Sequence, residues 1–290
     1  MAHTNTALLQ LLPNVLRARD FYLYLEGGKR ITDLWRWGGR AILGHKPPKV
    51  LTEMKNAAER GLFCPLPHPL QRRFTKALLE FFPGKTFRLY RDESSLRRTL
   101  ADAGLVAAGE GALYDPVFAP PDLPHEALKV SLWRPFLQDA PGSTTADTAA
   151  AANFAALVPV LPFPLGPAAL VLPAGADTSF PPGDIIPPVL LAAAARALYN
   201  LAAVQKTLPA NRDWPNYPKL RKALSDNLWR RNGIYLTLAQ PDMDGEKYEL
   251  LFRRFLEGGF LIPPTATEPL VLPLTMSAGE EAKLAQLIGG

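Results

Sequence analysis

The sequence is poor in the residues that most often carry chemistry on their own. Its 290 residues include one cysteine and four histidines. A single cysteine excludes an internal disulfide and agrees with a reducing compartment. Cys64 and His68 lie four positions apart, but no second pair of ligands accompanies them, so a tetrahedral metal site is not expected. We therefore expect a cytoplasmic protein without a metal centre.

Long hydrophobic runs and blocks of like charge are also missing. No stretch of about 18 or more uninterrupted apolar residues occurs, and no charged and apolar leader opens the chain, so we expect no membrane partner. The net charge is +5, yet lysines and arginines are interspersed with acidic residues. Short pairs such as Arg97-Arg98 fit solvated helix faces better than a nucleic-acid surface. Nucleic acid is therefore not an expected partner.

Apolar residues and prolines are plentiful instead. Hydrophobic residues make up 48% of the chain, enough for a full core, and the 30 prolines are concentrated between Pro65 and Pro188. A hairpin is expected over residues 21–35, because Gly27 and Gly28 can supply the positive φ of a tight turn. Further periodic patterns predict helices over 48–61, 70–82, 94–103, 188–208, 219–230, 247–256 and from 277, and strands over 87–90, 168–172, 234–238 and 260–262. Interleaved strands and helices favour an α/β class.

Ordered motifs stand near both ends of the chain. Asp33-Leu34-Trp35 follows the hairpin, and Leu43-Gly44-His45 precedes Pro48 and Val50. The later motifs are Asn232-Gly233-Ile234-Tyr235-Leu236, Gly258-Gly259-Phe260-Leu261-Ile262-Pro263 and Pro273-Leu274-Thr275. In this order they resemble the class III pyridoxal-phosphate-dependent aminotransferases.

The resemblance implies a fold type I transferase-like architecture, in a shortened and degenerate form. It places residues 1–62 and 205–290 in a small domain and residues 63–204 in a reduced large domain. It also implies a homodimer. We expect the contact to use the alternating aromatic side chains of the hairpin and the alanines of the long helix, namely Tyr22, Tyr24, Trp35, Trp37, residues 192–195 and Ala197.

The residues that catalyse in that family are not found at the matching positions. The family's phosphate-binding stretch corresponds to residues 91–95, where Asp92 and Glu93 would cap the helix and repel a phosphate. The place of the cofactor lysine falls near Leu157, and no lysine stands between Lys129 and Lys206. The substrate-binding arginine would fall within one residue of Pro269, where none occurs. We therefore expect no catalytic residue.

One remnant of cofactor binding is conceivable. Thr178-Ser179-Phe180 lies where the family has a Thr-Phe pair whose hydroxyl reaches the phosphate in the neighbouring subunit. Ser179 is thus a candidate cofactor-binding residue, although a plain helix-entry turn explains the same residues.

These observations favour a degenerate aminotransferase-like protein that acts in binding or assembly, without cofactor. Two alternatives stay open: an enzyme that binds pyridoxal phosphate through a displaced lysine such as Lys206, and an enzyme of different chemistry in the same cleft. His45 is expected to hold the junction between hairpin and helix through a local hydrogen bond.

Overall fold

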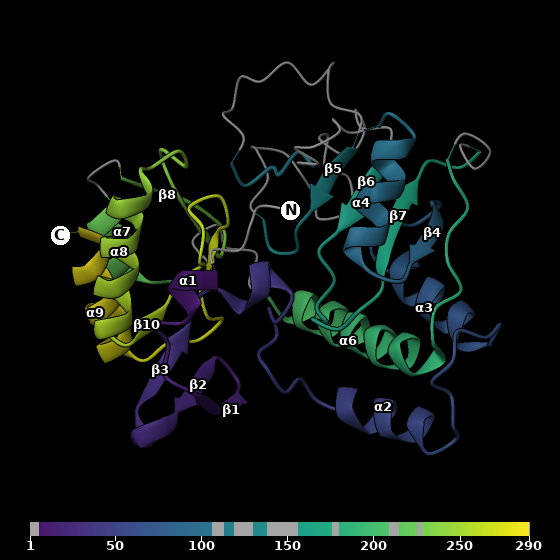
Figure 1. Cartoon of the computed structure of the whole chain (residues 1–290), viewed down its shortest axis with the longest axis horizontal. Helices are drawn as coiled ribbons and strands as arrows, with labels where there is room; N and C mark the ends of the chain where they lie inside the picture. Colours follow the sequence, from purple (N-terminus) through teal and green to yellow (C-terminus); the bar gives the residue numbers. More distant parts are fainter. Residues whose placement is uncertain are drawn as a thin grey trace. The chain divides into compact units, whose positions relative to one another are not determined.

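The structure is a computed structural model that describes residues 6–105, 113–118, 130–137, 156–175, 180–208, 215–224 and 228–289. The chain forms two compact units of mixed α/β structure (Figure 1). The middle unit comprises Pro47–Pro135 and Asp139–Thr207, and the end unit comprises Ala2–Lys46, Phe136–Gln138 and Leu208–Gly290. The predicted division differs at its first boundary, because residues 47–62 pack in the middle unit.

The middle unit is built on a four-stranded sheet in the order β4-β7-β6-β5. Its strands are β4 (Thr86–Tyr90), β5 (Val130–Trp133), β6 (Ala156–Pro159) and β7 (Ala168–Leu172). Strand β7 is antiparallel to β4 and β6, whereas β5 is parallel to β6. Strands β4, β5 and β6 therefore end at one side of the sheet, which we call the C-terminal edge.

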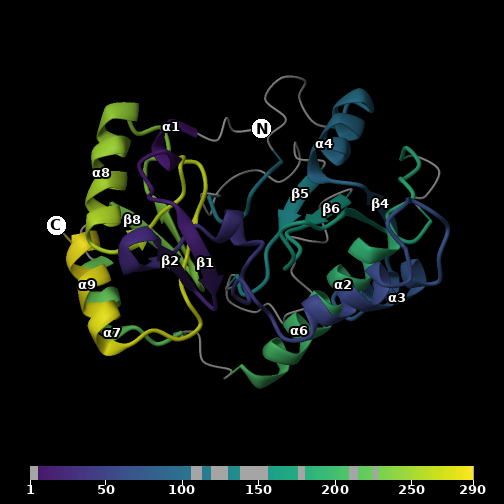
Figure 2. The same ribbon diagram turned by 60° about the horizontal axis from the view of Figure 1, so that its bottom comes forward.

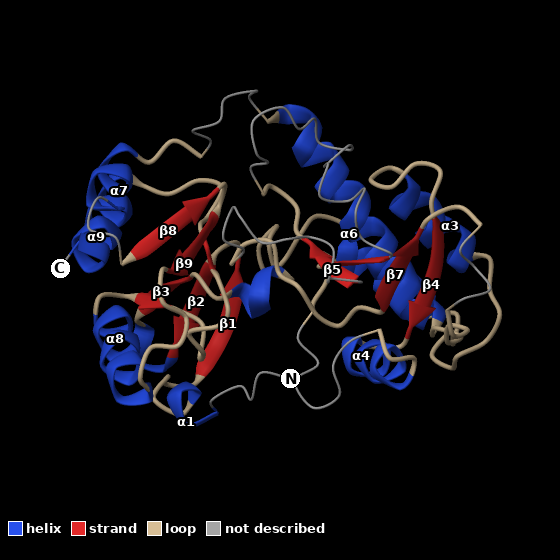
Figure 3. Cartoon of the chain, turned by 90° about the horizontal axis from the view of Figure 1, so that it is seen from above, coloured by secondary structure: helices blue, strands red, loops and turns tan. Residues whose placement is uncertain are grey.

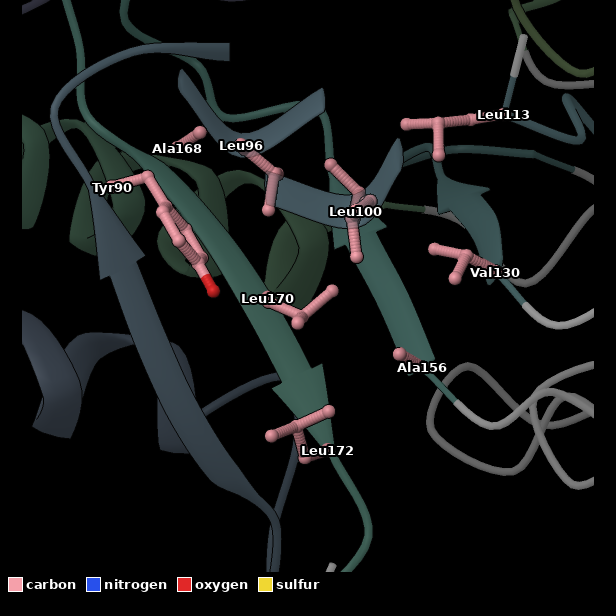
Figure 4. Close-up of a cluster of buried hydrophobic side chains, with 10 residues drawn as sticks. Tyr90, Leu96, Leu100, Leu113, Val130, Ala156, Ala168, Leu170 and Leu172 are labelled. Carbon is pink, nitrogen blue, oxygen red and sulfur yellow. The ribbon is translucent and has the colours of Figure 1, made fainter. Parts of the chain in front are cut away.

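Helix α4 (Glu93–Asp102) covers one face of this sheet (Figure 4). It begins directly after β4, and its apolar positions recur at helical spacing, so Leu96 and Leu100 face Tyr90, Val158 and Leu170. Both leucines are fully buried. This contact fixes the start of α4 at the C-terminal edge.

Three further helices pack together in the middle unit (Figure 2). They are α2 (Val50–Ala58), α3 (Leu70–Leu79) and α6 (Pro188–Thr207). Five alanines in the first half of α6 are at most 1% exposed, because they lie inside this unit: Ala192, Ala193, Ala194, Ala195 and Ala197. They are not available to a second copy of the chain. By length and composition α6 could cross a membrane, but 67% of the window that passes is buried, as in the core helix of a soluble protein.

The end unit contains two sheets (Figure 3). The first has the order β1-β2-β3-β10 and the second β11-β9-β8. Their strands are β1 (Val15–Arg19), β2 (Tyr22–Leu25), β3 (Arg30–Asp33), β8 (Trp229–Asn232), β9 (Tyr235–Leu238), β10 (Phe260–Leu261) and β11 (Leu270–Val271). The helices of this unit are α1 (Thr6–Leu9), α7 (Pro218–Ala223), α8 (Gly245–Glu257) and α9 (Ala278–Gly289).

The predicted hairpin is confirmed by the antiparallel pairing of β2 with β3. Its turn holds Gly27 and Gly28 at φ values of 79° and 81°, where a side chain would be strained. Strand β3 also pairs in parallel with β10, so the two ends of the chain complete one sheet.

The helix expected over residues 219–230 is wrong in its second half. Helix α7 ends at Ala223, and the two arginines Arg230 and Arg231 belong to strand β8. Trp229 begins that strand and is 4% exposed, and Gly233 turns the chain into β9 with a φ of 60°. Burial of one tryptophan and a tight Asn-Gly turn outweigh the helical preference of the charged residues.

Candidate functional site

The C-terminal edge of the middle sheet is the first candidate site. In open α/β sheets ligands bind beyond the carboxyl ends of the strands, where loop residues from neighbouring strands meet. The predicted phosphate-binding residues 91–95 fall here, in the link from β4 to α4 and in the first turn of α4. The predicted lysine position, Leu157, is the second residue of β6. Ser179 and Thr178 lie outside the described residues.

Asp92 caps helix α4, as the sequence predicts. Its Oδ1 accepts a hydrogen bond of 2.7 Å from the backbone N–H of Ser95. This hydrogen bond lowers the pKa of Asp92. On the other side of the turn, the N–H of Arg91 donates to Oδ2 of Asp184 at 2.9 Å. A carboxylate of the chain thus already occupies the positive end of α4.

Glu93 adds a second carboxylate to the same helical turn. Its Oε1 lies 2.8 Å from Nε and 2.5 Å from Nη2 of Arg97, one turn further along α4. Burial lowers the pKa of Arg97, and the charge of Asp115 acts in the opposite direction. Arg97 is therefore close to a second carboxylate as well as paired with the first.

Asp115 and Arg134 form a buried ion pair at the end of β5. Nε of Arg134 lies 2.9 Å from Oδ1 and Nη2 lies 2.7 Å from Oδ2, a two-pronged geometry that fits guanidinium to carboxylate. Their side chains are only 6% and 14% exposed. We call Glu93, Arg97, Asp115 and Arg134 the edge cluster. Its two arginines are matched by two carboxylates of the same chain.

Strand β6 offers an apolar side chain where the resemblance implies the cofactor lysine. Leu157 is 7% exposed and pairs with Val171 of β7. Its neighbours Ala156 and Val158 belong to the cluster under α4, so Leu157 points to the opposite face of the sheet. Beyond the strand, Val160 and Leu161 are also buried. A lysine at position 157 would therefore place its ammonium group in the apolar interior, on the face away from α4.

The residues at this edge do not fit pyridoxal phosphate. The phosphate needs free N–H donors and positive charge, but Asp92 caps the helix and Glu93 lies beside it. The aldehyde needs an amine, and β6 supplies none.

A second candidate site lies in the end unit, around Asp33 at the end of β3. Its Oδ1 accepts the backbone N–H groups of Trp35 and Arg36, both at 2.9 Å. Its Oδ2 lies 2.9 Å from Nε2 of His45. His45 thus holds the segment that follows the hairpin, as the sequence predicts.

Arg36 is fully buried beside Asp33, which the sequence does not indicate. Its guanidinium donates to three backbone carbonyl oxygens, from Asp33 at 3.1 Å, Ile42 at 3.3 Å and Val271 at 2.7 Å. Burial lowers the pKa of Arg36, while the Asp33 charge opposes this shift. The arginine therefore stabilises the segment that runs from β3 to Ile42.

An anionic side chain lies where the resemblance implies the substrate-binding arginine. Glu268 precedes Pro269, and its Oε2 accepts a hydrogen bond of 2.6 Å from Nε1 of Trp35. The charge at this place is thus opposite to the charge that would bind a carboxylate.

Comparisons with known proteins give similarity over different parts of the chain. No family model matches. An uncharacterized protein of Treponema pallidum is 28% identical over 92% of this chain and 91% of its own length. A glutamate-1-semialdehyde 2,1-aminomutase of Thermus thermophilus is 28% identical over 41% of this chain and 34% of its own length. The ornithine delta-aminotransferase structure of Plasmodium falciparum has a TM-score of 0.66 at 13% identity, covering 94% of this chain and 91% of that chain.

Proposed function

We propose that this chain, which has the fold of the class III pyridoxal-phosphate-dependent aminotransferases, is a non-catalytic, dimeric binding or assembly protein. The observation that supports this most is the N-terminus of α4. Asp92 accepts a backbone N–H of the helix there, and Glu93 stands in the same turn. A helix N-terminus attracts an anion only while its N–H groups and positive field are available.

The edge cluster supports the same proposal. An incoming phosphate would compete with Asp115 for Arg134 and with Glu93 for Arg97. The first competition is unfavourable, because the pair is bidentate and nearly buried. The arginines at this edge therefore balance the chain's own charges.

A displaced lysine is poorly placed to replace the one that is missing. The side chain of Lys206 is 74% exposed, and its Nζ lies 3.7 Å from Oε2 of Glu80. Glu80 precedes the first residue of β4, whereas the candidate site begins after the last. An imine would also need a less hydrated amine than this one.

The two described histidines do not favour a catalyst with a different acid–base chemistry. His68 accepts the N–H of Leu70 at the start of α3, and His45 is paired with the buried Asp33. Each imidazole has a hydrogen-bond partner that gives it a structural role, and neither lies at the C-terminal edge.

The test is spectroscopic. Purified protein is mixed with pyridoxal phosphate, dialysed and scanned in the visible range before and after borohydride, with the Thermus aminomutase treated in parallel and a Lys206→Ala variant as the internal control. We expect no dialysis-resistant band in either version of this chain. A band that survives dialysis and disappears with borohydride would overturn the proposal. If Lys206→Ala abolished that band, the displaced-lysine enzyme would replace it.

The dimer is proposed from the resemblance together with exposed apolar side chains in the middle unit. Leu51, Phe63 and Leu66 are 55%, 61% and 57% exposed, and the proposed contact covers them. Sedimentation across a wide concentration range tests this, with Phe63→Ser as the variant expected to weaken association. A monomer at all concentrations would contradict it. The cytoplasmic location stays a prediction.

A further inference from the structure

The turn after β3 has an unusual backbone. Arg36, Trp37, Gly38 and Gly39 all have positive φ, at 45°, 53°, 65° and 98°. Residues with a side chain rarely adopt this region, because Cβ approaches the neighbouring carbonyl oxygen. Two consecutive residues with side chains in it indicate strain, and strain of this kind is concentrated at sites of function.

The surrounding contacts hold the turn in this conformation. Asp33 binds the N–H groups that enter it, and Arg36 binds the carbonyl of Ile42 beyond it. Arg36 also reaches across to the carbonyl of Val271 on β11. The turn is thus fixed from both sides by a buried carboxylate and a buried guanidinium.

This rigid turn presents a tryptophan to solvent. Trp37 is 55% exposed, and its ring lies 4.9 Å from that of Trp35 at an interplanar angle of 43°. Trp35 is 9% exposed and donates its indole N–H to Glu268. A carboxylate therefore lies beside the indole of Trp35, and it is also 3.6 Å from the position that a Cβ on Gly38 would take.

Other aromatic rings of this unit already hold a cation of the chain. Arg17 lies over Tyr24 at 4.1 Å, and Arg30 lies over Tyr22 at 4.2 Å. Within the described residues no lysine or arginine is found over the ring of Trp37. Indole attracts cations more strongly than phenol does. Trp37, in the turn after β3, thus offers a partly exposed indole ring over which the described residues place no lysine or arginine.

We propose that Trp37, supported by Trp35 and Glu268, binds the ammonium head of a small organic cation. The indole face would contact the N-methyl or methylene groups, and the carboxylate would favour positive over neutral ligands. The rigid turn keeps the ring in place before the ligand arrives, which reduces the entropy lost on binding. This deepens the proposed binding role, but it concerns the end unit and does not depend on how the C-terminal edge of the middle sheet behaves.

The experiment uses choline and its uncharged isostere 3,3-dimethylbutan-1-ol as probes of the full chain. Both carry equivalent methyl groups whose NMR signals broaden or shift on binding, so loss of tryptophan from the protein does not remove the readout. We expect choline to bind at least about tenfold more tightly than the isostere, a factor that corresponds to about 1.4 kcal/mol. Equal binding of both probes, or binding of neither, would overturn the proposal.

Two variants locate the site. Trp37→Asn removes the ring while keeping a residue that tolerates positive φ, and Trp37→Phe keeps a weaker aromatic face. Choline binding should disappear in the first variant and weaken in the second, with melting temperatures close to that of the unmodified protein. Glu268→Gln should reduce the preference for choline over the isostere. Undiminished binding in Trp37→Asn would contradict the assignment, as would a second copy of the chain covering Trp37 in solution.

Discussion

The two units each bury an arginine, and they compensate its charge in different ways. Arg134 of the middle unit is held by both oxygens of Asp115, so an anion of the chain matches it directly. Arg36 of the end unit donates to backbone carbonyls, with Asp33 close by. The first arrangement neutralises the edge of a sheet, whereas the second stabilises a strained turn. A buried arginine can therefore mark a closed site in one unit and a rigid scaffold in the other.

Removing the carboxylate from the middle-unit pair should have the largest effect. Asp115→Ala leaves a guanidinium that is 6% exposed without its bidentate partner, and we expect unfolding free energy to fall by about 3–5 kcal/mol. Chemical denaturation measures this. Glu93→Ala is the matched control, since its pair with Arg97 is more exposed and should contribute about 1 kcal/mol or less.

A double variant tests whether the Asp115–Arg134 pair only balances charge. Asp115→Leu combined with Arg134→Met replaces both charges by apolar groups and should recover most of the loss. If the double variant were as unstable as Asp115→Ala, the pair would do more than balance charge.

Replacing the guanidinium of Arg36 by an ammonium group should have the next largest effect on stability. Arg36→Lys keeps a cation but cannot reach three carbonyls in different directions, so we expect a loss of about 2–3 kcal/mol. Arg30→Lys serves as the control, because Arg30 is 52% exposed and lies 3.5 Å from Glu280. Equal stability of Arg36→Lys and the unmodified protein would show that charge alone matters at this position.

The histidine beside Asp33 should contribute less. His45→Ala removes one of the three hydrogen-bond partners of a buried carboxylate, and we expect a loss of about 1–2 kcal/mol in thermal or chemical unfolding. His68→Ala, at the start of α3, provides the comparison in the middle unit. An unchanged melting temperature together with lost choline binding would instead assign His45 to the ligand site.

Alkaline pH should have a still smaller effect, through two buried phenols of the end unit. Burial raises the pKa values of Tyr217 and Tyr248, whose hydroxyls donate to carbonyls of Pro273 and Pro263. Both phenols stay protonated in the folded end unit, while unfolded phenols ionise near pH 10. Their stabilising contribution is complete below pH 10 and decreases as the pH rises above it.

The slope of this decrease is the measurable quantity. Each phenol should remove about 1.4 kcal/mol of stability by pH 11, relative to neutral pH. Tyr248→Phe should therefore show a shallower alkaline decrease than the unmodified protein when denaturation is followed between pH 8 and 11. An identical slope would mean that this phenol ionises in the folded state.

Local signals in the sequence predicted the parts of the fold that depend on local chemistry. The glycines of the hairpin, the cap at Asp92 and the apolar run of β7 each act within a few residues. Asn232-Gly233 is a strong local hairpin signal as well, and it indicates the strand that replaces the end of the helix expected over residues 219–230.

Local patterns in the sequence do not predict the contacts of the candidate sites. Asp115 and Arg134 meet because the segment at Tyr114 bridges to Ser131 beside β5, and Trp35 meets Glu268 across more than two hundred residues. Neither pairing has a local pattern. Arginine is also rarely buried, so composition alone gave no reason to place Arg36 in the core.

The parallel pairing of β3 with β10 also sets an order of events during synthesis. Thr32 pairs with Phe260, and after Thr32 the ribosome adds 228 residues up to and including Phe260 (260 minus 32) at ~5–20 per second, which takes roughly 10–45 s. All residues of the middle unit emerge within that interval. The amino-terminal hairpin would meanwhile expose its β3 edge and the apolar side chains of Leu23 and Ile31, which the finished protein buries. The nascent chain should therefore need protection at its first strands long after they have left the ribosome.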